Sequence, residues 1–204
     1  MHYFLVGKRV LTCLVFAAVM WGASESFAAS DVSIKVKARS ESNDDDGEIE
    51  LETEQSFATT AFQTETEVYT LQINLKNNRD QKYKGVLQWC FISDHSTGDT
   101  YDEEPIKAVL ATFSPGKKEI VLSPGAALNE SMVSEPFVFE EKTVETEWYD
   151  SGDTTTYEYE TGDVYKGYVL FFTVNGEVLA RSSNSSRYLK DEWIEKCSAA
   201  IKEL

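Results

Sequence analysis

Apolar and polar residues alternate along most of the chain after residue 30. Residues 69–75 place Tyr, Leu, Ile and Leu at every second position, with polar residues between them. Side chains of a strand point alternately to opposite faces, so this pattern predicts a strand with one buried face. Residues 86–92 are apolar on nearly both faces, which predicts a strand in the centre of the core. Further strands are expected at 32–37, 106–113, 119–122, 132–139, 144–148, 156–159, 168–174 and 177–180.

Short polar segments separate these strands. Asn175 and Gly176 form a dipeptide typical of a two-residue hairpin, because both residues tolerate positive φ. Residues 150–153 join the two arms of a projecting hairpin over residues 144–160. Further turns are expected where Asn, Asp, Gly, Ser and Pro gather, at 43–47, 114–116 and 123–125.

The C-terminal tail has a different period. Leu189, Trp193, Cys197 and Ile201 recur every four residues, with charged residues between them. This spacing predicts an amphipathic helix whose apolar stripe packs against the strands. Ser185 or Ser186 is expected to cap its start.

Many short strands with tight turns and one terminal helix predict an all-β fold. We expect an antiparallel two-sheet sandwich over residues 29–184 and a C-terminal helix, packed on the sandwich, within residues 185–204.

Three features of the chain resemble a known class of sandwich. With residues 71–75, Trp89 and residues 120–125, the chain resembles immunoglobulin-like or fibronectin type III-like sandwiches of exported bacterial proteins with no known activity. The resemblance implies that Trp89 is a core residue, and it supplies no catalytic residues. The cysteine pair that joins the two sheets of immunoglobulin domains is absent, since Cys90 adjoins Trp89 and Cys197 lies in the expected helix.

Residues 1–28 have the three parts of an export signal. Lys8 and Arg9 precede an apolar run at 10–23, and Ala28 completes a small-residue cleavage site. The run is shorter than the roughly 20 residues that span a bilayer, so we expect cleavage after Ala28 rather than a membrane anchor. The mature protein is therefore expected in the periplasm or outside the cell, without membrane insertion.

Acidic residues dominate the mature chain. Cleavage removes Lys8, Arg9 and Glu25, which changes the formal net charge from −16 to −17. Such a charge repels phosphate backbones and anionic lipids, so nucleic acids and membrane surfaces are poor partners. A protein or a glycan partner remains open, and no cofactor is expected.

Candidate catalytic and metal-binding groups are few. His95 lies in the segment Ser-Asp-His-Ser, but adjacent strand residues point in different directions, whereas a catalytic triad needs converging side chains. The carboxylates at 44–48 and 99–104 lack the spacing of a calcium loop, so solvated loops are expected, with weak calcium binding as the alternative. A hydrolase that uses paired carboxylates is disfavoured, because the acidic residues are too numerous to single out a pair.

The aromatic residues of the 144–160 hairpin are the candidate binding residues. Trp148, Tyr149, Tyr157 and Tyr159 offer rings that stack on sugars or on a partner protein, or that pair across the hairpin itself. We expect a non-enzymatic protein with a binding or structural role, and a carbohydrate-binding module is the alternative.

Cys90 and Cys197 are the two cysteines that remain after signal cleavage. Both are expected to face packed surfaces, one in an apolar strand and one on the apolar stripe of the helix. An oxidising compartment favours a disulfide between them. Two separately buried thiols are the alternative.

Overall fold

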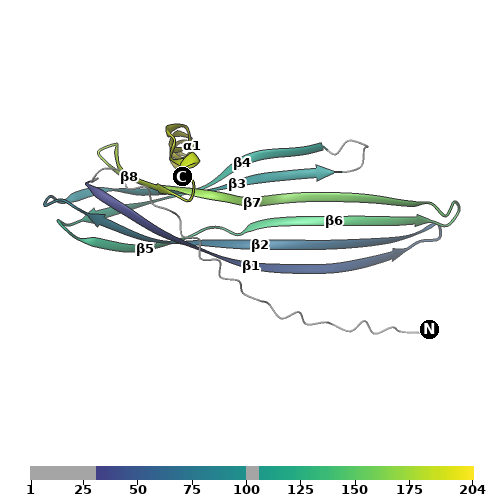
Figure 1. Ribbon diagram of the computed structural model, residues 1–204. Helices are drawn as coiled ribbons and strands as arrows, with labels where there is room; N and C mark the ends of the chain where they lie inside the picture. The colour runs from purple at the N-terminus through teal and green to yellow at the C-terminus, as the bar shows by residue number, and fades with distance from the viewer. Residues whose placement is uncertain (1–30, 100–105) are drawn as a thin grey trace.

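The computed structural model describes residues 31–99 and 106–204, and that part of the chain forms eight strands and one α-helix (Figure 1). No helix in these two ranges is long and apolar enough to cross a membrane. The export signal predicted at residues 1–28 lies outside the described residues. The elements are β1 (Val32–Glu52), β2 (Ser56–Asn77), β3 (Tyr83–Asp99), β4 (Ile106–Leu122), β5 (Ala127–Val133), β6 (Phe137–Trp148), β7 (Thr154–Val174), β8 (Glu177–Ser183), a 3₁₀-helix η1 (Ser186–Leu189) and α1 (Asp191–Lys202).

Hydrogen bonds join all eight strands in one antiparallel sheet. The strand order is β1-β2-β6-β7-β3-β4, and in addition β5 pairs with β2 and β8 pairs with β7. The fold is thus mostly β with a C-terminal helix, as expected, but the strands do not form two separate sheets. The reason is β6, which pairs with β2 along one edge and with β7 along the other and so bridges the two groups of strands.

The sheet opens at one end into two layers. β6 begins at Phe137 and does not extend into this end of the molecule. There, β2 pairs with β5 and β7 pairs with β8. Figure 1 shows these layers overlapping at the left. Tyr69 and Tyr165 are stacked with ring centroids 3.6 Å apart, and both pack against the main core. That core consists of large apolar side chains from both layers, among them Leu71, Ile73, Leu75, Leu87, Phe91, Leu170 and Phe172.

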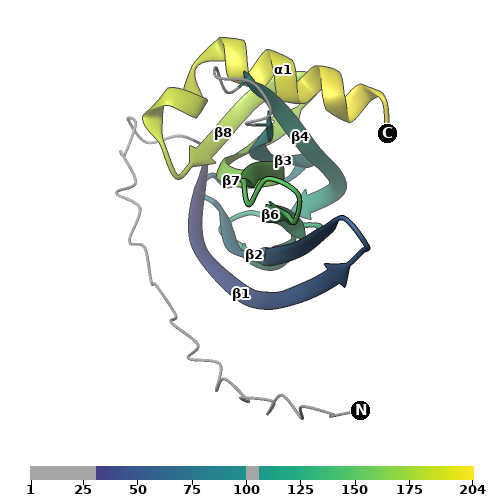
Figure 2. The same cartoon turned by 90° about the vertical axis from the view of Figure 1, so that its right-hand side faces the viewer.

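The helix α1 covers the outer face of the layer that contains β3, β4 and β7. Cys197 and Ile201 of the helix form a second buried cluster with Cys90, Val169 and Phe171 of the strands. Seen end-on, α1 lies on one side of the strands and β1 on the other (Figure 2). The two apolar faces predicted for residues 86–92 are thereby explained, because one faces the main core and the other faces the helix.

The helix begins later than the sequence predicts. Ser185 precedes the 3₁₀-helix and Lys190 precedes α1, and neither makes a side-chain capping hydrogen bond. The prediction of a capping serine was therefore wrong.

Two predicted turns are strand instead. Residues 43–47 continue β1 and pair with residues 62–66 of β2. Their charges are tolerated because this part of the strand is largely exposed. Residues 114–116 continue β4, where Pro115 pairs with Cys90. Proline is accepted there because β4 is an edge strand, and an edge strand has no neighbour on one side to receive its N–H.

The strand predicted at 132–139 is instead divided between β5 and β6 by residues 134–136. The other predicted turns are confirmed. Asn175 has φ 52° and Gly176 has φ 87°, which fits the positive φ values that a type I′ turn requires at both positions.

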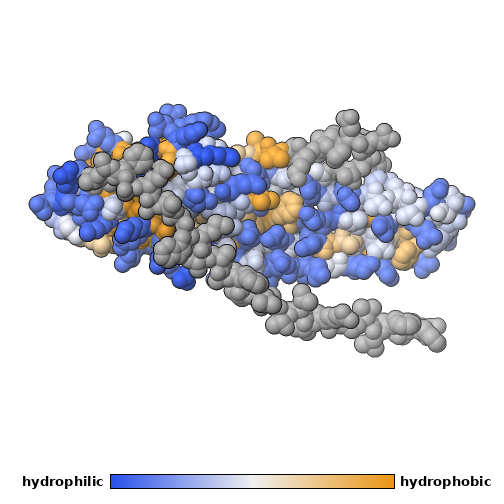
Figure 3. Space-filling view, in the orientation of Figure 1, coloured by the Kyte–Doolittle hydropathy of each residue, from blue (hydrophilic) through white to orange (hydrophobic). Residues whose placement is uncertain are grey.

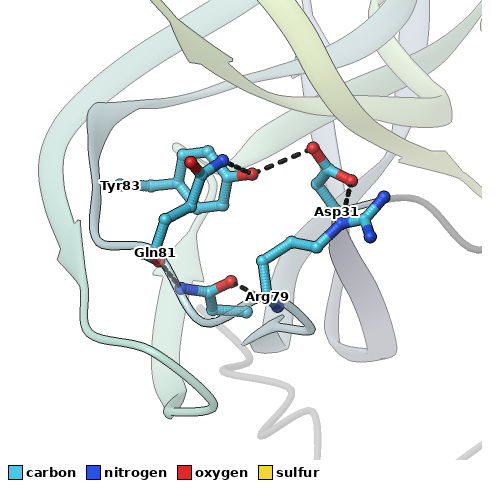
Figure 4. Close-up of polar contacts among 5 residues, drawn as sticks. Asp31, Arg79, Gln81 and Tyr83 are labelled. Carbon is cyan, nitrogen blue, oxygen red and sulfur yellow. Dashed lines mark hydrogen bonds and ion pairs between the residues drawn. The ribbon is translucent and has the colours of Figure 1, made fainter.

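A hydrogen-bonded network ties Asp31 to the two-layer end (Figure 4). Arg79 donates from Nε to one Asp31 carboxylate oxygen at 2.5 Å, and the Tyr83 hydroxyl donates to the other at 2.9 Å. Gln81 donates to the Tyr83 hydroxyl. The bonds from Arg79 and then Tyr83 lower the pKa of Asp31, so its ionised form is the one that the fold prefers.

Candidate functional site

Beyond the two-layer end, the sheet continues as a single projecting layer. We call its outer part the tip sheet: residues 43–52 of β1, 56–66 of β2, 138–148 of β6 and 154–161 of β7. It occupies the right-hand part of Figure 1. Residues paired across an antiparallel ladder point to the same face. The register therefore assigns each side chain of the tip sheet to one of two faces.

Apolar residues from all four strands gather on one face of the tip sheet. Ile49 pairs with Thr60, Thr60 with Val144, and Val144 with Tyr157, so these four residues form one row across the sheet. Neighbouring rows on the same face contribute Leu51, Phe62, Thr146 and Tyr159. We call this surface the aromatic face.

The aromatic face is open to solvent within the described part of the chain. Ile49 is 60% exposed, Leu51 62% and Tyr159 43%. In the space-filling view, hydrophobic residues interrupt the hydrophilic surface of the projecting half (Figure 3). Single exposed apolar residues are common, but a group that crosses four adjacent strands is typical of an interaction surface.

The contact between Phe62 and Gly47 shapes part of the aromatic face. They are cross-strand partners, and the Phe62 ring occupies the space that a side chain at position 47 would need. A β-carbon at position 47 would come closer to the ring than real contacts allow. Glycine at this position therefore leaves room for the end of the Phe62 ring against β1.

The opposite face of the tip sheet is acidic, and we call it the acidic face. None of the residues that the register places on it is Lys or Arg. Burial raises the pKa of Glu65, and the charges of Glu67, Asp44 and Glu141 raise it further. The carboxylates of this face are Asp44, Asp46, Glu48, Glu50, Glu52, Glu65, Glu141, Glu145, Glu147, Glu158 and Glu160.

Three of the four predicted binding residues share the aromatic face. Tyr157 and Tyr159 lie within it, and Trp148, 44% exposed, is assigned to the same face by the alternation from Val144. Tyr149 lies in the adjoining turn, where its hydroxyl donates to Glu52 at 3.3 Å.

Sequence reasoning missed the contribution of β1 and β2 to this face. Ile49, Leu51 and Phe62 lie beside the hairpin residues only because β1 and β2 extend to the tip. Ile49 and Leu51 do alternate with Glu48, Glu50 and Glu52, which is a strand pattern. The turn predicted at 43–47 argued against a strand that continues as far as Ile49 and Leu51.

The segment around His95 forms a polar network at the inner end of the projecting layer. His95 Nδ1 lies 3.4 Å from Asp163, and Thr112 donates to the same carboxylate at 3.2 Å. The hydroxyl of Ser93 is hydrogen-bonded to Thr112 at 2.5 Å rather than to the imidazole. Asp94 forms an ion pair with Lys166 instead. Ser93, Asp94 and His95 thus have separate partners and do not form a triad with one another.

The acidic segment at 44–48 lies on a strand rather than in a loop. Asp44, Asp46 and Glu48 point to one face of β1 and Asp45 to the other, by strand alternation. The described ranges contain no group of three or more His, Cys, Asp or Glu residues that could hold a metal ion. The side chains predicted at 99–104 lie outside the described residues.

Cys90 and Cys197 come together between β3 and α1. Both are fully buried free thiols in the same cluster. A hydrogen bond with Cys197 raises the pKa of Cys90, and burial adds to this effect. The predicted neighbourhood of the two cysteines is thus observed, whereas the predicted disulfide is not formed in this structure.

Comparison with known proteins adds little to this picture. No family model and no curated protein matches the chain. A solved structure described as the X-ray structure of Northeast Structural Genomics Consortium target SoR45 is 13% identical, over 81% of this chain and 93% of that chain. Its TM-score is 0.20, so the similarity carries no argument about fold or function.

Proposed function

We propose that the mature chain is a non-enzymatic, extracytoplasmic binding protein that contacts a partner protein through the aromatic face of the tip sheet. The observation that carries this proposal is the row from Ile49 to Tyr157 together with Phe62 of the neighbouring row, because these residues bring apolar side chains of four strands to one exposed surface. Aromatic anchors, tyrosine and tryptophan above all, dominate the energy of protein interfaces. The export-like pattern of residues 1–28 supports the location.

The two-layer end serves as the scaffold in this proposal. Two groups of antiparallel strands pack there around one core, and we propose that this end is the counterpart of the immunoglobulin-like sandwich expected from the sequence. Function then resides in the projecting layer.

A carbohydrate ligand is the second candidate. Tyr157, Tyr159 and Trp148 offer rings on one face, which suits stacking on sugar rings. Ile49, Leu51 and Val144 lie among these rings and offer aliphatic surface, while the polar groups of the same face belong to Thr60, Thr146, Lys142 and the tyrosine hydroxyls. This composition favours a protein.

Binding assays on surface variants test the proposal. The mature protein and a Trp148→Ser/Tyr157→Ser/Tyr159→Ser variant are compared on a glycan array and in capture from extracytoplasmic extracts. A Val121→Ser/Val133→Ser variant, changed at exposed apolar positions outside the tip sheet, is the matched control. We expect protein capture that the control retains and the aromatic-face variant loses. Capture that survives in the aromatic-face variant would contradict the proposal, and sugar binding lost in that variant would support the second candidate.

A further inference from the structure

We infer that the outer edge of β1, along the tip sheet, accepts an extended segment of a partner protein in which basic and apolar side chains alternate. The inference rests on the proposed function, because the added segment extends the aromatic face by one strand. It names the chemistry of the partner, which the proposed function leaves open.

The backbone of β1 is available for strand addition. β1 is the first strand in the sheet order and pairs with β2 alone, so within the described residues no strand occupies its other edge at positions 43–52. An edge strand presents a row of N–H and C=O groups that pair readily with an extended peptide.

The side chains of β1 set the alternation of the partner. Glu48, Glu50 and Glu52 point to the acidic face, while Ile49 and Leu51 point to the aromatic face. The side chains of an added strand alternate in the same way. Residues opposite the glutamates therefore meet carboxylates, and residues opposite Ile49 and Leu51 meet apolar surface.

The carboxylates of β1 favour a partner strand with basic side chains. The β2 residues paired with Asp46, Glu48 and Glu50 are Gln63, Ala61 and Thr59, so β2 offers these carboxylates no cationic cross-strand partner. Opposite charges directly across a ladder are favourable and like charges are unfavourable. A strand with Lys or Arg at every second position supplies the missing partners.

The same charges argue against a second copy of this chain at this edge. Pairing β1 with another β1 would place the acidic residues 44–52 of both copies side by side, which costs free energy. Acidic edge residues thus exclude self-pairing while they leave the edge open to a basic strand.

Synthetic peptides test the inference. The probe is a labelled peptide of about ten residues, the length of a long strand, with alternating lysine and valine. One control peptide alternates glutamate and valine, and another has the same lysines and valines in two blocks. Binding to the mature protein is measured by fluorescence anisotropy at low and high salt, and hydrogen exchange of β1 is followed with and without peptide.

Two charge-reversal variants are compared in this assay. Glu48→Lys/Glu50→Lys is the edge variant. Glu195→Lys/Glu203→Lys is the control, which makes the same change in net charge at two exposed positions, one within α1 and one directly after it. We expect the alternating lysine peptide to bind more weakly as salt rises, to protect amides at 44–52, and to lose at least about tenfold in affinity in the edge variant alone.

Several results would overturn the inference. The first is an equal loss of affinity for the alternating lysine peptide in both variants. The second is that the two-block peptide binds as tightly as the alternating one, and the third is that the peptide does not slow hydrogen exchange of β1. A dimer of the mature protein that dissociates in the Leu51→Lys variant would also overturn the inference, because a second copy of the chain would then occupy the edge of β1. If the peptide fails while the aromatic-face variant still loses its captured protein, the proposed function stands and only this inference fails. If that variant retains capture, the proposed function itself fails.

Discussion

The ring of Phe62 lies across Gly47, its partner on the neighbouring strand. The pair shows how the aromatic face is built, because a residue without a side chain on the edge strand leaves room for the end of an aromatic ring from β2. Gly47 thus has a packing role, and it is not one of the glycines with positive φ.

Gly47→Ala should displace the Phe62 ring without unfolding the protein. The added β-carbon would collide with the outer ring atoms, and the ring can swing away because it ends a flexible side chain. We expect the free energy of unfolding to change by no more than about 1 kcal/mol. Nuclear Overhauser contacts between the Phe62 ring and residue 47 should weaken or disappear. Unchanged contacts would show that the ring does not lie over position 47.

Glu65→Gln should stabilise the protein at neutral pH. Burial and the neighbouring carboxylates raise the pKa of Glu65 in the folded state, so its ionised form opposes folding. That penalty is present at pH 7 and vanishes below the unfolded pKa of about 4.3. Thermal unfolding should therefore show a higher midpoint for the variant at pH 7 and no difference near pH 3. Glu195→Gln on α1 is the control, and an equal gain there would assign the effect to net charge alone.

Asp31→Asn should show the opposite dependence on pH. The bonds from Arg79 and Tyr83 lower the pKa of Asp31, so its carboxylate contributes stability above the unfolded pKa of about 3.9. That contribution is lost as the pH falls through the folded pKa. The variant should melt at a lower temperature than the wild type at pH 7, and the gap should close in strong acid. Asp150→Asn, in the exposed tip turn, should have little effect at either pH. A gap that persists in strong acid would contradict this account of the network.

Cys90 and Cys197 should form a disulfide when the folded protein meets an oxidant that carries a disulfide, such as oxidised glutathione. Each thiol loses its hydrogen, the two sulfurs bond, and the oxidant is reduced to two thiols. The bridge would close a loop of 107 residues, and the chain-entropy model gives at most about 4–5 kcal/mol for it. After oxidation, denaturation and alkylation, intact mass should show no alkyl adducts and the melting temperature should rise. Two adducts would sink the idea, and Cys197→Ser is the control that cannot form the bridge.

The sequence predicts single strands well and their connections poorly. Alternation at 69–75 and the Asn175-Gly176 turn are local signals, and both are confirmed. The joining of all strands in one sheet depends on which strands lie beside β6, and side-chain alternation contains no information on that choice. Two sheets were therefore the natural but incomplete expectation.

In the candidate site, too, the sequence predicts the local features and not the long-range ones. Trp148, Tyr157 and Tyr159 were recognised from the hairpin pattern, because hairpin partners are close in sequence. Ile49 and Phe62 were missed because they join the face through long-range pairing and through a strand that carries Asp and Gly. Such residues usually mark turns, but a strand with exposed faces tolerates them.

Photocrosslinking from two adjacent residues tests the central claim most directly. Tyr159 lies on the aromatic face and Glu158 on the acidic face of the same strand, so a benzophenone amino acid at either position samples opposite surfaces of one sheet. In cells that export the chain, irradiation should join a partner protein to position 159 and not to position 158. The absence of an adduct at 159, or equal adducts at both positions, would contradict the account.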